Sequence, residues 1–196
     1  MKNLIFLLFF ILSQVMCAQE KPNPETYYAV IPNAPEEYTP GTVVSRMIDG
    51  LGFRYYWATE GLTETNLNYK PSEEARTLSQ TIDHLYGLSR TIVNSAKEEP
   101  TDFTEKLPEL SYTEKRFATL ENFRMASSLF LVSKDLSKHK ITFIRPNGSS
   151  EFPFWNHING PIEDAVWHAG QVVVLRRASG NPINPKVSVF QGKLND

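Results

Sequence analysis

Residues 160–178 read GPIEDAVWHAGQVVVLRRA, and this stretch decides the fold that the sequence predicts. Pro161 suits the first helical position, where an amide hydrogen has no helical partner, and Glu163 favours the first turn. Two arginines near the other end complement the helix dipole, and Gly180 can adopt the left-handed conformation that ends a helix. The stretch therefore predicts a helix from residue 160 to Ala178.

Three further segments upstream have apolar residues at steps of three and four, the period of a helix with one buried face. We expect helices over residues 42–62 and 72–96. A third is expected to open at residues 111–114, SYTE, which match a capping box. The second is expected to start at Ser72, a hydroxyl cap followed by two acids. The expected core positions are Val44, Met47, Leu51, Tyr55, Ala58, Leu62, Leu78, Ile82, Leu85, Leu88, Ile92, Phe117, Leu120, Phe123, Ala126 and Phe130.

The apolar period changes between the third and fourth segments. Residues 141–144 and 151–155 are β-prone and flank the run RPNG, in which Asn-Gly is a hairpin signal. Pro153 would place the second strand at a sheet edge. The predicted fold class is all-α: a four-helix bundle over residues 42–182 with a small β-hairpin between helices three and four. A C-terminal tail, residues 183–196, is expected to include a short strand.

The N-terminus has the features of an exported protein. Residues 1–18 read as a signal peptide, because residues 4–12 are unbroken apolar and small residues precede a cleavage point after Ala18. A membrane span needs ~20 such residues. The expected location is periplasmic or secreted, and lipid anchoring through Cys17 is the alternative. Residues 19–41 are rich in proline and are expected to form an extended lead-in.

Composition excludes several classes of protein. The chain has 196 residues, enough for one core, and a net charge of −2 without a basic cluster, so no nucleic-acid partner is expected. No other apolar run is long enough for a membrane span. The single cysteine excludes an intramolecular disulfide framework and a cysteine-rich metal site.

The four histidines differ in what surrounds them in the sequence. His139 lies in a basic loop and is expected at the surface, whereas His157 precedes the fourth helix and favours a structural or capping role. His84 borders the core stripe of the second helix, where a hydrogen-bonded core histidine is the ordinary interpretation. Asp164 and His168 are four residues apart on the fourth helix, so their side chains lie on one face. An ordinary Asp–His pair is the alternative to metal ligation there.

Two histidines and a carboxylate from two helices would form a three-ligand site with positions left for water or substrate. His84, Asp164 and His168 are therefore the candidate ligands of a divalent metal ion, with Zn, Ni, Mn and Fe all open. Such an ion acidifies a bound water or thiol, or polarises a carbonyl. Spacing alone is a weak signal for this site.

His84, together with the run DAVWHAGQ at residues 164–171, resembles the DinB-like (DinB/YfiT) superfamily, whose members are metal-binding four-helix bundles. The family signature in the fourth helix is similar to His-x-x-x-His, any residue, then Gly-Gln, and its later half stands at residues 168–171. Asp164 occupies the position where the family usually has its first histidine. The resemblance covers residues 42–182 and implies the same three ligands.

The resemblance implies a metal-dependent hydrolase, or a transferase or isomerase that uses a low-molecular-weight thiol, acting on a small molecule. Export argues against a cytosolic thiol and favours hydrolysis or metal-dependent binding. The alternatives are a non-catalytic metal- or small-ligand-binding protein of the cell envelope and a purely structural bundle, and a homodimer is left open. Residues expected around the ligands, as hydrogen-bond partners or substrate contacts, are Gln171, Tyr56, Glu60 and His157.

Overall fold

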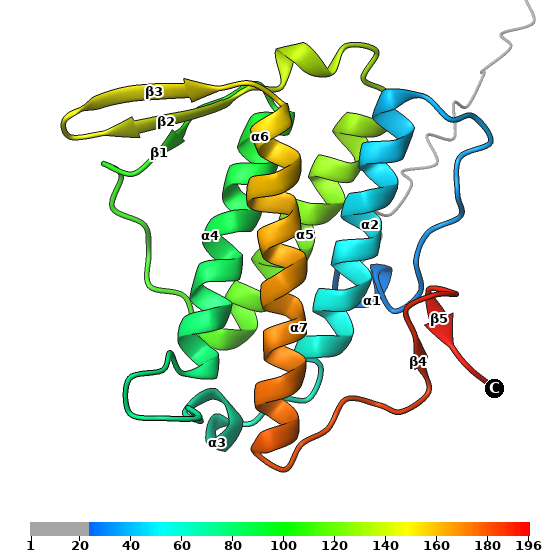
Figure 1. Cartoon of the computed structure of the whole chain (residues 1–196), viewed down its shortest axis with the longest axis vertical. Coiled ribbons are helices and arrows are strands. Elements are labelled where there is room, and N and C mark those ends of the chain that lie inside the picture. The colour runs from blue at the N-terminus through cyan, green and yellow to red at the C-terminus, as the bar shows by residue number, and fades with distance from the viewer. Residues whose placement is uncertain (1–23) are drawn as a thin grey trace, which may run out of the picture.

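The computed structural model describes residues 24–196, so the predicted signal peptide and Cys17 lie outside the described residues. Four long helices pack side by side: α2 (Pro40–Thr59), α4 (Leu78–Ala96), α5 (Tyr112–Leu131) and α7 (Glu163–Ala178) (Figure 1). Both α5 and α7 pack against α2 and α4. The chain is therefore mainly α-helical with a small sheet, as the sequence predicts.

Hydroxyl side chains start three of these helices. Thr39, Thr77 and Ser111 each accept a hydrogen bond from the backbone amide three residues later, forming capping boxes. The cap at Ser111 was predicted, but the expected start of α4 at Ser72 is wrong. The helix begins at Leu78, where the backbone amide also donates to the carbonyl of Tyr69. A short helix, α3 (Glu64–Leu67), separates α2 from α4.

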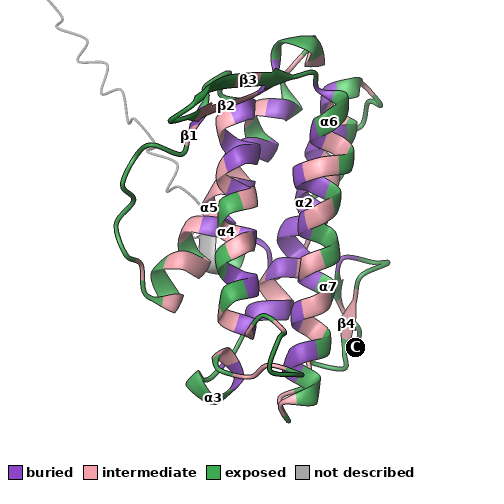
Figure 2. Cartoon of the chain, turned by 60° about the vertical axis from the view of Figure 1, so that its left-hand side comes forward, coloured by how far each residue is buried: buried purple, intermediate pink, exposed green. Residues whose placement is uncertain are grey.

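The core lies between the four helices (Figure 2). Most predicted core positions are buried, which confirms the helical period of the sequence. Phe117 is an exception, since 42% of its surface is exposed. No helix of the described chain is both long and apolar enough to cross a membrane. The buried apolar residues on the long helices are Val44, Ile48, Leu51, Phe53, Tyr55, Ala58, Leu78, Ile82, Leu85, Ile92, Val93, Ala96, Leu120, Phe123, Ala126, Phe130, Ala165, Ala169, Val172 and Leu175.

The described part of the lead-in is packed against the helices rather than extended throughout. It contains a short helix, α1 (Pro24–Tyr27), followed by the fully buried Tyr28. The Tyr28 hydroxyl donates to a carboxylate oxygen of Asp49 at 3.1 Å. A Cβ at Gly52 would lie 2.5 Å from the Tyr28 ring, so glycine is required for this close approach.

A three-stranded sheet extends from one end of the helices in the order β1 (Thr101–Asp102), β2 (Ile141–Arg145), β3 (Gly148–Phe152) (Figure 1). The antiparallel β2–β3 pair confirms the predicted hairpin, and β3 lies at the edge. The expected bounds of its second strand, 151–155, are wrong, because β3 ends before Pro153 and Trp155 lies in a helix. Gly148 has a φ of 129°, a conformation that favours glycine. The tail forms a second small pair, β4 (Val187–Ser188) and β5 (Lys193–Leu194), which confirms a strand there.

The helical path into α7 starts earlier than predicted. A turn of helix, α6 (Trp155–His157), and a π-helical turn, η2 (Ile158–Ile162), precede it. Gly160 interrupts the helical geometry with a φ of −97° and a ψ of −109°. Gly180 has a φ of 84° after the helix, which confirms its predicted capping conformation.

Arg176 fixes the other end of α7 to α2. Its side chain is buried, and its guanidinium donates to the carbonyls of Trp57 and Ala58 at 3.0 Å each. It also donates to the backbone and side-chain oxygens of Asn181. The guanidinium thus satisfies carbonyls at the end of α2 that lack helical partners, which fixes the position of α7.

Candidate metal centre

Two helices bring the three predicted ligands together. His84 lies in the middle of α4, while Asp164 and His168 lie one turn apart in the first half of α7. An oxygen of the Asp164 carboxylate lies 3.0 Å from His84 Nε2, and its other oxygen lies 3.4 Å from His168 Nε2. The two imidazole rings are nearly perpendicular, with centroids 4.6 Å apart. The carboxylate therefore lies within reach of both rings.

The spacing of these groups fits a single ion. One potential ligand atom from each of the three residues lies within 4.8 Å of the others. Ligands bound at 2.0–2.2 Å around a tetrahedral or octahedral ion lie about 3.0–3.5 Å apart. The two N–O distances fall in this range, so small side-chain adjustments would bring all three atoms to one ion.

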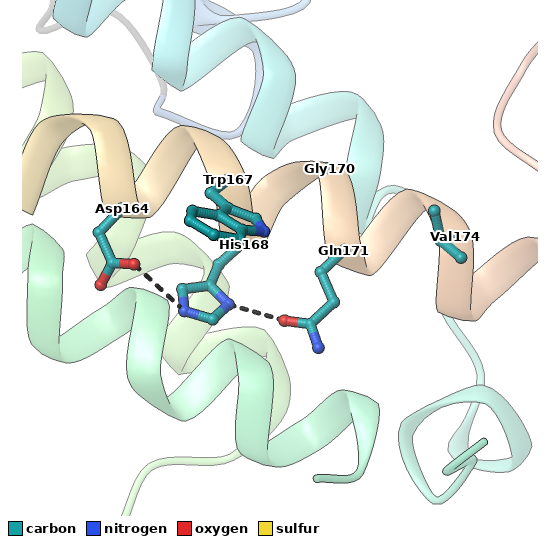
Figure 3. A pocket seen from close by; sticks show the side chains of 6 residues that line it. All are labelled: Asp164, Trp167, His168, Gly170, Gln171 and Val174. Carbon is teal, nitrogen blue, oxygen red and sulfur yellow. Dashed lines mark hydrogen bonds and ion pairs between the residues drawn. The ribbon is translucent and has the colours of Figure 1, made fainter. Parts of the chain in front are cut away.

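Gln171 holds one of the candidate ligands in place. Its side-chain oxygen lies 2.7 Å from Nδ1 of His168 (Figure 3). An amide oxygen only accepts hydrogen bonds, so Nδ1 is the donor in this contact, and in a neutral imidazole Nε2 then keeps the lone pair that a metal ion would use. This arrangement is typical of metal-binding histidines, whose second nitrogen usually donates to a protein oxygen. The predicted role of Gln171 as a hydrogen-bond partner of a ligand agrees with this contact.

The candidate centre is accessible to solvent. The side chains of His84 and Asp164 are 36% and 38% exposed, and that of His168 is 18% exposed. An open depression of about 770 Å³ lies along α7 beside the two ligands of that helix. It is lined by Asp164, Trp167, His168, Gly170, Gln171 and Val174 (Figure 3).

Trp167 was not among the residues predicted for the site. Its indole is 77% exposed and lines the depression next to His168. The signal in the sequence is a large aromatic residue directly before a candidate ligand, at a helix position outside the core stripe. Gln80 and Arg76 were also missed; they line a smaller hollow with Asp83 and His84.

Two residues predicted near the metal lie elsewhere on the described chain. Tyr56 and Glu60 lie at the end of α2, where both contact Arg116 of α5. The Glu60 carboxylate accepts from the Arg116 guanidinium at 2.8 Å, and the guanidinium lies 4.9 Å from the Tyr56 ring centre. Neither residue lines the depression beside Asp164.

The other two histidines are buried together at the end of the helices that carries the sheet. The expectation that His139 is a surface residue is wrong: it is 6% exposed, and its ring nitrogens contact Ser133 and the carbonyl of Ser95. His157 is fully buried beside Phe130, and neither of its ring nitrogens has a hydrogen-bond partner among the described residues. Burial lowers the pKa of His157 from 6.5 to about 4.

The structure thus separates His157 from the centre that the sequence associated with it. Its side chain makes no capping hydrogen bond, and its ring packs against Phe154 as well as Phe130. These contacts are those of a core residue.

The chemistry available at the centre follows from its donors. Two imidazoles and one carboxylate suit a borderline divalent ion, and their exposure leaves room for further ligands. Nε2 of His84 has to present its lone pair to bind an ion, so a bound ion would replace its present contact with Asp164. Comparisons with protein-family models, curated proteins and solved structures give no significant match to this chain.

Proposed function

We propose that the chain is an exported, DinB-like four-helix protein that binds one divalent metal ion through His84, Asp164 and His168. The observation that carries the proposal is the convergence of these side chains from α4 and α7, with potential ligand atoms within 4.8 Å of one another. The hydrogen bond from His168 to Gln171 supports it, because it holds the ring and leaves Nε2 available to an ion.

The donor set restricts the metal to a class. Two imidazoles and one carboxylate suit Zn, Ni, Mn or Fe, whereas Ca and Mg prefer sites made wholly of oxygen. Replacement of the family's first histidine by Asp164 makes the site harder and favours Mn and Fe more than a site of three histidines would.

We propose metal-dependent hydrolysis or thiol-dependent transfer on a small molecule as the activity. A bound divalent ion supplies an acidified water or thiol, or polarises a carbonyl. The chain's own part is to hold the three donors, fix the His168 ring through Gln171, and offer an apolar surface at Trp167. The depression has room for a small molecule beside the ligands.

A non-catalytic metal-binding protein of the cell envelope is the second candidate. One observation favours it: the titratable side chains that line the depression are the two ligands Asp164 and His168. The remaining lining residues offer an indole, an amide and apolar surface, none of which is a general base near neutral pH.

The binding claim is tested on the secreted form of the protein, purified without a histidine tag, stripped with a chelator and titrated with Zn, Ni, Mn and Fe(II). Calorimetry and elemental analysis are expected to give one equivalent of at least one metal. Asp164→Asn should abolish binding. Asp83→Asn is the matched control, because Asp83 is one residue from His84 but pairs with Lys115. Failure of every metal to bind, or equal loss in both variants, would contradict the proposal.

Activity is tested separately on the loaded protein with panels of esters, amides and thiol acceptors. Turnover that disappears in Asp164→Asn supports the enzyme, whereas stoichiometric binding without turnover supports the second candidate. Both outcomes require that the metal first be shown to bind.

A further inference from the structure

The outer face of α7 is apolar and exposed along its middle. Trp167 is 77% exposed, Val174 is 60% exposed and Val166 is 37% exposed. α7 packs on α2 and α4, and these three are its exposed large apolar residues. Contiguous apolar surface of this kind on a soluble protein marks an interaction site.

Gly170 lies at the centre of this face without a role inside one chain. A Cβ at this position would meet no atom within 4 Å, and the backbone has ordinary helical geometry. A glycine within a helix costs about 1 kcal/mol relative to alanine. The absence of a side chain would therefore benefit a partner that packs on this face from outside. Small residues allow such close packing between helices.

The residues of the face are arranged symmetrically about Gly170. Val166 and Val174 are four residues before and after it, and Trp167 is three residues before it. Val173, three residues after it, is half-buried and packs against the core. These are the steps that place residues on one side of a helix. An antiparallel copy of the same helix, crossing at Gly170, would set Val166 of each copy opposite Val174 of the other.

The charges at the two ends of the face follow the same symmetry. Glu163 is seven residues before Gly170, and Arg177 is seven residues after it. Both side chains are exposed, and neither belongs to an ion pair of the described chain. In an antiparallel pair, Glu163 of each copy lies near Arg177 of the other, so two pairs of opposite charge form across the interface.

From this pattern we propose that one face of α7 binds a second copy of the chain. The face is formed by Glu163, Val166, Trp167, Gly170, Val174 and Arg177. The copies are related by a two-fold axis at Gly170, with their α7 helices antiparallel. Such an interface is isologous, so each contact occurs twice. A parallel arrangement would instead bring like charges together, which disfavours it.

The proposed dimer adds a wall to the candidate centre. Trp167, Gly170 and Val174 line the depression beside Asp164 and His168. A second copy on this face would partly cover that depression and reduce the access of water to it. The association itself uses no metal ligand, so it stands or falls independently of metal binding.

Light scattering and sedimentation of the metal-free protein over a range of concentrations test the dimer. The wild type is expected to give the mass of two chains, and Gly170→Arg the mass of one, with an unchanged circular dichroism spectrum. Glu163→Arg and Arg177→Glu should each weaken dimerisation by about tenfold, and their combination should restore it. A monomeric wild type, or a dimer indifferent to Gly170→Arg, would overturn the proposal.

Cross-linking locates the axis directly. In a Cys17→Ser background, Gly170→Cys should form an intermolecular disulfide under mild oxidation, because residues on a two-fold axis face their own copies. Ser128→Cys, on the exposed face of α5, is the matched control and should stay monomeric. Equal cross-linking of both variants, or none at Gly170→Cys, contradicts the assigned axis.

Discussion

The four histidines lie in two regions of the molecule that differ in exposure and in neighbouring groups. His84 and His168 lie beside a carboxylate on the solvent side of α4 and α7, with their side chains 36% and 18% exposed. His139 and His157 lie at the end that carries the sheet, buried against the ring of Phe130. The first pair is placed for an exchangeable ligand, and the second pair is part of the core.

The difference shows that the hydrogen-bond partners and the burial of a histidine, rather than its residue type, decide its role. At the candidate centre, a carboxylate and an amide oxygen orient imidazoles that keep access to solvent. At the end that carries the sheet, desolvation keeps His157 neutral, and its ring nitrogens have no hydrogen-bond partner among the described residues. Metal binding and acid sensitivity are therefore expected to reside in separate regions of the protein.

The largest effect is expected from Phe130→Ala at the buried end. Phe130 is fully buried and contacts His139, His157 and Phe154. Its truncation should lower the free energy of unfolding by about 3–5 kcal/mol, measured by denaturant titration. The affinity of the folded protein for metal should be unchanged. A parallel loss of metal affinity would show that the two regions are coupled.

Next in size is the loss of a ligand, through His84→Ala or His168→Ala. Changes to outer partners of metal ligands cost 10–100-fold in affinity, so loss of a ligand should cost about 100-fold or more. Calorimetric titration measures the change. Gln80→Ala is the control, because Gln80 lines the same hollow as His84 without belonging to the triad. Full affinity in both histidine variants would refute ligation.

Acid should weaken the buried end through His157. Its pKa in the folded protein is about 4, below the ordinary 6.5, so the unfolded chain binds more protons between these values. The stability contributed by neutral His157 is complete above about pH 6.5 and is lost as the pH falls toward about 4. Between pH 7 and pH 5 this loss amounts to about 2 kcal/mol.

Replacement of His157 by phenylalanine tests this sign. His157→Phe keeps a ring beside Phe130 and Phe154 and removes the titrating group, so unfolding free energies should depend less on pH over the same range. Chemical denaturation at several pH values measures the difference. An unchanged pH dependence would show that another group causes the acid sensitivity.

The smallest effect is expected at Gln171, which touches a ligand without being one. Gln171→Ala removes the acceptor of His168 Nδ1 and should weaken metal binding by about tenfold. Gln171→Glu keeps an oxygen acceptor and should retain the affinity. If both variants bind like the wild type, the hydrogen bond does not set the orientation of His168.

Local patterns predicted much of this arrangement. The core stripes, the cap at Ser111 and the hairpin depend on neighbours within a few residues, and the structure contains them. The placement of Asp164 and His168 on one face followed from their spacing. That His84 lies opposite them depends on how α4 packs against α7, for which the sequence offered the family resemblance.

Long-range contacts explain the errors. Ser72 with its two following acids is locally as good a helix start as Thr77, but the amide of Leu78 donates to Tyr69 and α4 begins there. His139 has lysines on both sides, yet its ring is buried against Phe130. Neither contact leaves a periodic signal in the sequence.

The claim that one ion joins α4 and α7 is tested most directly by anomalous diffraction from crystals of the metal-loaded protein, at the absorption edge of the bound metal. We expect a single strong peak between His84, Asp164 and His168, within bonding distance of all three. A peak at another position, or ordered side chains that turn away from one another around no peak, would contradict it.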